Sequence, residues 1–159
     1  MAKIARILVP TDFSTASDAA LAFARDLGGQ FGASIELVHV FEDPFLSGAF
    51  VGDGTVMMPA DLRQALETAA REQLASRHSA HAGSLPGSSA ELLLGSAAKG
   101  IVERAAETHA DLIVMGTHGR SGLGHLLIGS VAERVVRTAR VPVLTVPDPE
   151  RLAATQKAR

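Results

Sequence analysis

The sequence predicts a single-domain α/β fold, an open sandwich in which a parallel sheet carries helices on both faces. Apolar residues along the 159-residue chain alternate between strand spacing and helical spacing, in the order β-α-β-α-β-α-β-α-β. Several of the strand segments are apolar on both faces, which is typical of strands buried in a parallel sheet. A chain of this length buries roughly 70% of its unfolded surface, so it needs no disulfide or metal to fold.

The first strand is predicted over Ile4 to Val9, a β-branched and apolar run that Pro10-Thr11-Asp12 closes. Apolar residues at helical spacing then predict a helix from about Ala16 to Phe31. Gly28-Gly29 and Gly32 are expected to end this helix, because glycine adopts the left-handed conformation that follows many helices.

The middle of the chain repeats this alternation. A second strand is expected over Ser34 to Phe41 and a second helix over Asp61 to His81. The apolar stripe of that helix consists of Leu62, Leu66, Ala69, Ala70 and Leu74. A third strand, Ser89 to Leu94, leads through Gly95-Ser96 into a helix. That helix places Ala98, Ile101, Val102, Ala105 and His109 on one face.

The last elements are a fourth strand over Leu112 to Met115, a helix from about Ser130 and a fifth strand over Val141 to Val146. We assign residues 1–147 to the domain and expect residues 148–159 to form a flexible tail. The connection from Glu42 to Pro59 is long for such a fold. It is either a mobile lid or partner surface, or a loop whose apolar residues pack on the body.

Composition and charge exclude several classes of protein. Hydrophobic residues make up 47% of the chain and charged residues 20%, which argues against disorder. The absence of cysteine excludes disulfides, thiol chemistry and cysteine-based zinc sites. With no signal-peptide pattern and no apolar run long enough to span a bilayer, we expect a soluble, cytoplasmic protein and no membrane partner.

The charge is uneven along the chain. Residues 1–80 hold six Lys or Arg against ten Asp or Glu, whereas residues 81–159 hold nine against seven. The C-terminal half is therefore the better place for an anionic ligand, although surface solvation also explains such an imbalance. Nucleic acid is not an expected partner, because there is no basic stripe and no Tyr or Trp to stack on bases.

Two predicted strand ends carry residues suited to a ligand, and ligands of open α/β sheets bind beyond the carboxyl ends of the strands. The first is Pro10-Thr11-Asp12-Phe13-Ser14, and the second is the stretch from Gly116 to Ser130. Five glycines between positions 116 and 129 leave backbone N–H groups open to an anion, and Gly129-Ser130 then begins a helix. Further donors come from Arg120 and from the hydroxyls of Thr117, Ser121 and Ser130. The sequence therefore predicts phosphate binding.

A simpler interpretation of the helix start is a capping box formed by Ser130 and Glu133. Capping alone does not require Gly116, Gly119, Gly122 and Gly124. Two known phosphate-binding motifs are excluded. Gly124 to Ser130 resembles half of a Walker A loop, but Val131 follows and the required lysine is missing, and Pro10 to Ser17 contains no glycine for a dinucleotide fingerprint.

After the fourth strand, Gly116 and Gly119 are separated by two residues, and nine residues then precede Gly129-Ser130. This glycine spacing resembles the ATP-binding signature of the universal stress protein family. The segments Ile7 to Ser14, Val38-His39-Val40, Asp111 to Gly119 and Val141 to Val146 are also similar to that family, so the resemblance covers essentially the whole chain. It implies a five-stranded parallel sheet in the order 3-2-1-4-5, and homodimers paired through the fifth strand, Val141 to Val146.

The resemblance also implies a site for ATP, with Mg²⁺ expected on the phosphates. Val40 would offer backbone hydrogen bonds to adenine, and Pro10, Thr11 and Asp12 would line the adenine and ribose. Gly116, Gly119, Arg120, Ser121 and Gly122 would surround the ribose and phosphates, and Gly129, Ser130 and Val131 would hold the terminal phosphates. His118 and His125, in the same loop, either contact phosphate or face water.

Three functions remain open at this stage. The leading hypothesis is an ATP-binding regulator of a stress response that acts on an unknown protein partner. The second is ATP hydrolysis or adenylyl transfer; only slow turnover is expected, because Asp12 is the one carboxylate at a strand end near the loop. The third is a dimeric interaction protein that binds no nucleotide. Among the other histidines, His39 is expected to be a core residue, while the pair His78 and His81 has a spacing that could hold a metal.

Overall fold

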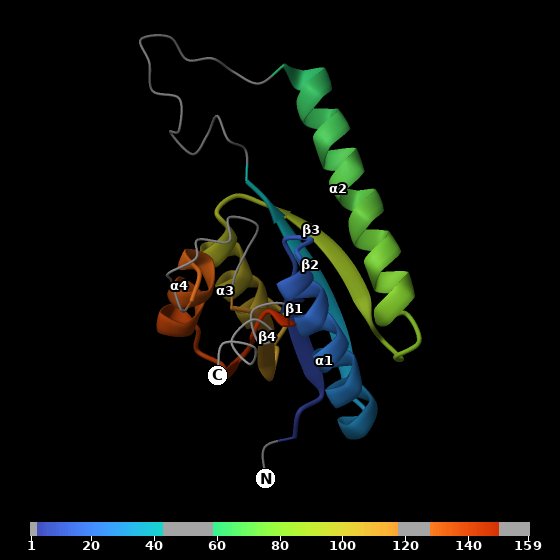
Figure 1. Ribbon diagram of the computed structural model, residues 1–159, viewed down its shortest axis with the longest axis vertical. Helices are drawn as coiled ribbons and strands as arrows, with labels where there is room; N and C mark the ends of the chain where they lie inside the picture. The colour runs from blue at the N-terminus through green and yellow to red at the C-terminus, as the bar shows by residue number, and fades with distance from the viewer. Residues whose placement is uncertain (1–2, 43–58, 118–127, 150–159) are drawn as a thin grey trace, which may run out of the picture.

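The computed structural model describes residues 3–42, 59–117 and 128–149, and these form a five-stranded parallel sheet with helices on both faces (Figure 1). The strands lie in the order β3-β2-β1-β4-β5, which confirms the predicted fold class and strand order. The strands are β1 (Arg6–Pro10), β2 (Ser34–Phe41), β3 (Ser89–Leu94), β4 (Leu112–Gly116) and β5 (Val143–Val146). The helices are α1 (Thr15–Phe31), α2 (Ala60–His81), α3 (Ala97–Glu107) and α4 (Ser130–Thr138).

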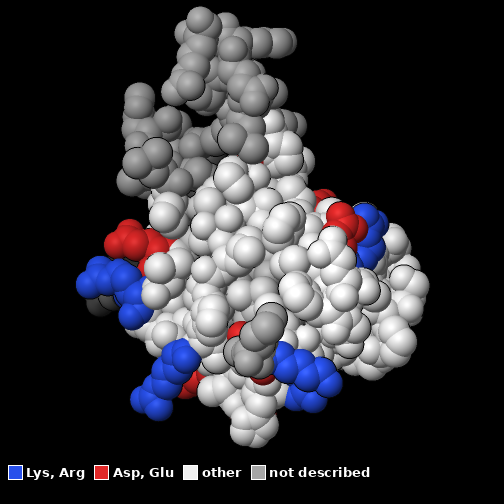
Figure 2. Space-filling model, turned by 90° about the horizontal axis from the view of Figure 1, so that it is seen from below, with Lys and Arg blue, Asp and Glu red and all other residues white. Residues whose placement is uncertain are grey.

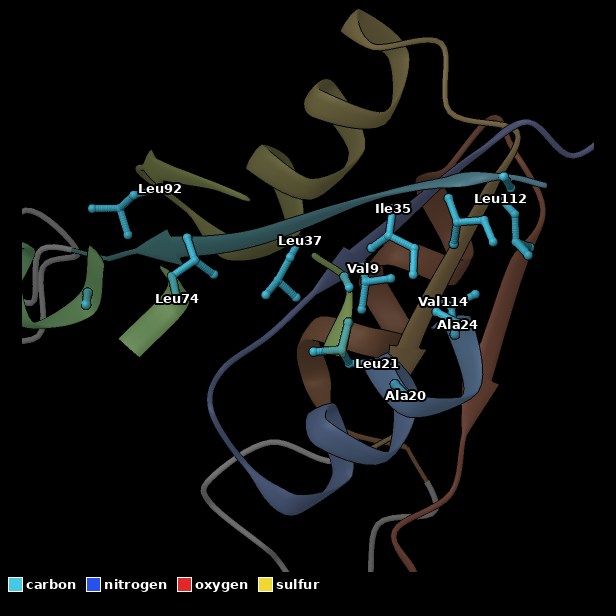
Figure 3. Close-up of a cluster of buried hydrophobic side chains, with 14 residues drawn as sticks. Val9, Ala20, Leu21, Ala24, Ile35, Leu37, Leu74, Leu92, Leu112 and Val114 are labelled. Carbon is cyan, nitrogen blue, oxygen red and sulfur yellow. The ribbon is translucent and has the colours of Figure 1, made fainter. Parts of the chain in front are cut away.

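Strand periodicity divides the core into two layers. Ile7 and Val9 of β1 pack on the side of α1 and α2, whereas Leu8 between them packs on the side of α3 and α4. The first layer is shown in Figure 3, where Leu21 of α1 and Leu74 of α2 meet the strand side chains. All three β1 side chains are fully buried, as a central parallel strand requires.

Two strands begin later than predicted. β1 begins at Arg6 rather than Ile4, because the backbone N–H groups of Ala5 and Arg6 donate to the Asp111 carboxylate and not to a neighbouring strand. β5 begins at Val143 rather than Val141, after Pro142. The prediction of strands in these places is confirmed. At their other ends, β1 and β4 each extend one residue further than predicted, to Pro10 and Gly116.

The predicted helix ends also need correction. Gly32 ends α1 with a φ of 66°, but Gly28 and Gly29 lie inside the helix. Gly28 is tightly packed there, since a Cβ would lie 3.1 Å from the backbone oxygen of Ala33 and 2.9 Å from the end of the flexible Leu85 side chain. His109 is not on a helix face: α3 ends at Glu107, and His109 adopts a φ of 52° in the turn that follows.

The apolar stripe predicted for α2 is only half buried. Ala70 and Leu74 are buried, whereas Leu62 and Leu66 are 48% and 42% exposed. The N-terminal half of α2 runs past the ends of β2 and β3, so no strand lies beneath it (Figure 1). Helical spacing identified the face of α2 but not how far the sheet reaches along it.

The end of the molecule opposite to this projection has a mainly uncharged centre. Figure 2 shows Lys and Arg around its rim, intermingled with Asp and Glu in small separate groups. No helix among the described residues is long and apolar enough to cross a membrane.

Candidate functional site

A cavity of about 730 Å³ opens at the carboxyl ends of β1, β2 and β4. The chain leaves β1 toward β2 and β3 on one side, then crosses to β4 and β5 on the other. The connections after β1 and β4 therefore diverge, and open α/β sheets bind ligands at such a switch point. The cavity continues under α2, where Leu66 and Gln73 line its wall.

Eight of the predicted site residues line this cavity: Pro10, Thr11, Asp12, Val40, Gly116, Thr117, Ser130 and Val131. They come from four separate parts of the chain, so the fold brings the two predicted strand ends together. Gly129 precedes α4 and is not among the lining residues. The remaining predicted residues, His118, Gly119, Arg120, Ser121 and Gly122, lie outside the described residues, as does the stretch 43–58 of the long connection.

The turn after β1 is fixed by its own side chains. Thr11 Oγ1 accepts from the backbone N–H of Phe13 at 3.0 Å, and Asp12 Oδ1 accepts from the backbone N–H and the hydroxyl of Ser14 at 3.1 and 2.5 Å. Ser14 is also the N-cap of α1, since its hydroxyl accepts from the backbone N–H of Ser17. Asp12 is thereby held at the rim of the cavity by short local contacts.

Gly116, at the end of β4, packs so closely on α1 that no side chain fits. A Cβ there would lie 2.9 Å from the backbone carbon and oxygen of Ala16. This glycine therefore allows the end of β4 to approach the start of α1, next to the cavity. The sequence analysis assigned Gly116 to the ligand, and the structure shows that packing alone also requires it.

The start of α4 is not the capping box that was the alternative interpretation of this stretch. The N-cap is Gly129, whose backbone N–H donates to the carbonyl of Thr117 at 2.6 Å, and Ser130 is the first helical residue. Ser130 therefore does not cap α4 through its hydroxyl, and Gly129 has no side chain to do so. Because the first N–H groups of a helix need acceptors, this end of α4 is suited to an anion in the cavity.

The start of α3, on the same cavity, is filled by a carboxylate of the chain itself. Glu42 Oε1 accepts from the backbone N–H of Ala97 at 2.6 Å, while the N-cap residue Ser96 makes no side-chain cap hydrogen bond. A negative charge at this position interacts favourably with the positive end of the α3 helix dipole. It also repels a second anion from the same place. Of the starts of α3 and α4, that of α4 is therefore the better place for phosphate.

His39 and Phe13 form part of the wall that sequence reasoning missed. His39 was expected in the core, but it is half-buried and lines the cavity. Its Nδ1 lies 2.8 Å from the carbonyl oxygen of Thr11, which can only accept, so Nδ1 carries the proton. The Phe13 ring packs on the imidazole with centroids 4.3 Å apart. A polar residue at the end of an otherwise apolar strand was the signal that could have identified His39.

The alternative metal site at His78 and His81 gains little support. Within the described ranges, no group of three or more His, Cys, Asp or Glu side chains could hold a metal ion. His78 Nε2 is buried and makes no hydrogen bond to the residues that the structure describes.

The fold and the cavity together define a parallel α/β sandwich with a ligand-sized cavity at the switch point of its sheet. The family model described as the universal stress protein family matches residues 3–147, and the chain belongs to this family. It is 34% identical over 153 residues to a universal stress protein of Methanocaldococcus jannaschii, covering 92% of this chain and 84% of that protein. The structure of the universal stress protein UspA from Lactobacillus plantarum superimposes with a TM-score of 0.75 at 25% identity, covering 92% of this chain and 99% of that one.

Two further structures of the same fold contain adenine nucleotides. One is a universal stress protein from Archaeoglobus fulgidus in complex with dAMP, with a TM-score of 0.62 and 24% identity over 91% of this chain. The other is a universal stress protein in complex with cAMP, with a TM-score of 0.63 and 22% identity over 92%. At these identities the similarity to this chain is one of fold.

Proposed function

We propose that this protein binds ATP, with Mg²⁺ on the phosphates, in the cavity at the carboxyl ends of β1, β2 and β4. The observation that carries the proposal is the start of α4 at this cavity, where Gly129 supplies no capping side chain. An anionic ligand is the natural acceptor for such N–H groups. The two nucleotide complexes of the same fold add that this architecture accommodates an adenine nucleotide in other proteins.

In this proposal the base would lie against Val40, whose backbone would read adenine, and against Pro10 and Thr11. Asp12 would make a polar contact to the nucleoside or to a water bound by the metal. Toward the phosphates, Gly116, Thr117, Ser130 and Val131 would be joined by Gly129 and by the stretch from His118 to Gly122. The Glu42 carboxylate, bonded to the start of α3, favours the same orientation, because it would repel phosphates from the base end.

The proposed role is that of a nucleotide-dependent regulator in a stress response, located in the cytoplasm and acting on a protein partner. We further propose a homodimer that pairs through β5. Of the carboxylates among the described residues, Asp12 and Glu42 line the cavity. Both already accept hydrogen bonds from the chain, which favours binding with at most slow hydrolysis over efficient turnover. The competing function is a dimeric interaction protein that binds no nucleotide.

The absence of Trp and Tyr gives a direct test, because the protein should be almost transparent at 280 nm. Any adenine retained through purification would dominate the ultraviolet spectrum near 260 nm. We would record the spectrum of the desalted protein, release and identify the chromophore, and titrate nucleotide-free protein calorimetrically with ATP and Mg²⁺. A matched pair of variants completes the test: Gly119→Leu in the glycine-rich stretch, and Gly29→Leu in α1, where a Cβ meets nothing within 4 Å.

Saturable heat from ATP in the wild type and in Gly29→Leu, with none in a folded Gly119→Leu, would support the proposal. A wild type that gives neither an adenine band nor binding heat would overturn it in favour of the dimeric interaction protein. Equal binding by both glycine variants would leave ATP as the ligand but exclude the glycine-rich stretch from its site.

A further inference from the structure

Phe13 occupies a backbone conformation that a bulky residue rarely adopts. Its φ is 66°, in the left-handed region, between the two cavity residues Thr11 and Asp12 on one side and the helix cap Ser14 on the other. Such conformations persist only where several contacts enforce them, and they are concentrated at functional sites.

Two of the contacts that hold Phe13 involve Thr11 and His39. The backbone N–H of Phe13 donates to Thr11 Oγ1 at 3.0 Å, and the ring packs on His39, which itself binds the carbonyl of Thr11. These three residues all line the cavity. These two contacts orient Phe13, but neither of them involves its backbone carbonyl oxygen.

Arg77 of α2, which lies outside the cavity, contacts both the carbonyl oxygen and the ring of Phe13. Its Nη2 donates to the carbonyl oxygen of Phe13 at 3.2 Å, and its guanidinium lies 4.9 Å from the centre of the Phe13 ring. Its Nε donates to Asp18 Oδ1 of α1 at 2.8 Å, which fixes the plane of the guanidinium. Arg77 does not line the cavity, so it cannot act by touching the ligand there.

We propose that Arg77 is a positioning residue for nucleotide binding, which holds Phe13 in its left-handed conformation and so fixes Thr11 and Asp12 at the cavity rim. The inference rests on the proposed function. Arg77 stabilises the ligand-binding shape of the turn before the ligand arrives, and a preformed turn spares the ligand the cost of ordering it.

A purely structural role is the alternative, because α2 buries little of its own surface. Ala70 and Leu74 are its buried residues, so Arg77 could serve only to attach α2 to α1. The attachment role and the positioning role make different demands on the side chain that binds Asp18. Attachment needs only the ion pair, which a lysine can restore, whereas positioning needs the planar group that bonds Asp18 and Phe13 at once.

The test compares R77M and R77K with R71M, a control arginine on the exposed surface of the same helix. Calorimetric titration with ATP and Mg²⁺ gives the affinity, and thermal unfolding gives the stability. The imidazole signals of His39 in the nucleotide-free protein report on the Phe13 ring beside them, and are assigned by their loss in H39N. We expect R77M to weaken ATP binding roughly 5- to 20-fold and to shift the His39 signals. We expect R77K to melt near the wild type but still to bind more weakly than it, and R71M to match the wild type throughout.

Unchanged affinity and unchanged His39 signals in a folded R77M would overturn the positioning role. Full recovery of affinity in R77K would also overturn it, in favour of simple attachment of α2. If the wild type itself gives no binding heat, the proposed function fails and this inference fails with it. Binding by the wild type together with unaltered binding by R77M removes only the role of Arg77.

Discussion

The Nδ1 atom of His39 lies 2.8 Å from the carbonyl oxygen of Thr11, and this bond joins the end of β2 to the turn that follows β1. The two residues are 28 positions apart in the chain. The bond directs the imidazole toward the Phe13 ring and places both on the cavity wall. A histidine expected to serve the core thus helps to shape the candidate site.

Replacing His39 by leucine removes the donor to Thr11 while keeping a side chain of similar size. We expect H39L to lower the free energy of unfolding by about 1 kcal/mol and to weaken ATP binding, because the Thr11 carbonyl loses its partner. Urea unfolding and calorimetric titration measure the two effects. H39N, which retains a donor, should lose less affinity; an H39L protein as tight as the wild type would contradict the expectation.

Glu36 is a buried carboxylate held by one arginine. Arg104 Nε and Nη2 lie 2.7 and 2.5 Å from Glu36 Oε1, and the Glu36 side chain is 7% exposed. This hydrogen bond raises the pKa of Arg104, so the guanidinium stays charged and its share of the stabilisation is lost only as the pH rises above the ordinary arginine value.

R104M leaves the Glu36 carboxylate buried without its partner. We expect a loss of about 3 kcal/mol, measured by urea unfolding at pH 7. K99M, at an exposed position of the same helix, should change stability by less than about 0.5 kcal/mol. A deficit equal to that of K99M would mean that water reaches Glu36.

Two glycines near the ends of elements should respond oppositely to alanine. G116A places a Cβ 2.9 Å from the Ala16 backbone, and we expect it to destabilise by about 1–3 kcal/mol and to disturb the cavity. G29A meets nothing within 4 Å inside α1 and should stabilise by about 0.5–1 kcal/mol. Thermal unfolding of both proteins measures the difference, and a neutral G116A would show that β4 can move away from α1.

The proposed homodimer can be tested at the outer edge of β5. The carbonyls of Pro142 and Val146 accept from β4, so by the strand period the backbone N–H of Thr145 points away from the sheet. T145P removes this outward donor and leaves the β4–β5 ladder in place. We expect a dimeric wild type and a monomeric, folded T145P by light scattering. A T145P protein that remains dimeric would exclude pairing through β5.

The comparison between prediction and structure differs from element to element. The ends of β1 and β4 were identified from Pro10-Thr11-Asp12 and from the glycines after Met115, because residues that break a strand are local signals. The alternative capping role of Ser130 is not found, since Gly129 is the N-cap; a serine beside a glycine fits either the cap or the first helical position. Leu62 and Leu66 were placed on the correct face of α2 but not at the correct depth, because helical spacing carries no information on the length of the neighbouring strands.

By itself the sequence determined the order of strands and helices along the chain, the parallel sheet, and the two strand ends whose residues suit a ligand. These follow from periodicity and turn residues, which act over a few neighbouring positions. Only the tertiary structure decided that Phe13, His39 and Arg77 meet at one wall of the cavity, with Arg77 lying 64 positions from Phe13. Contacts over such separations depend on how finished helices pack on the sheet, and no local pattern of side chains records that packing.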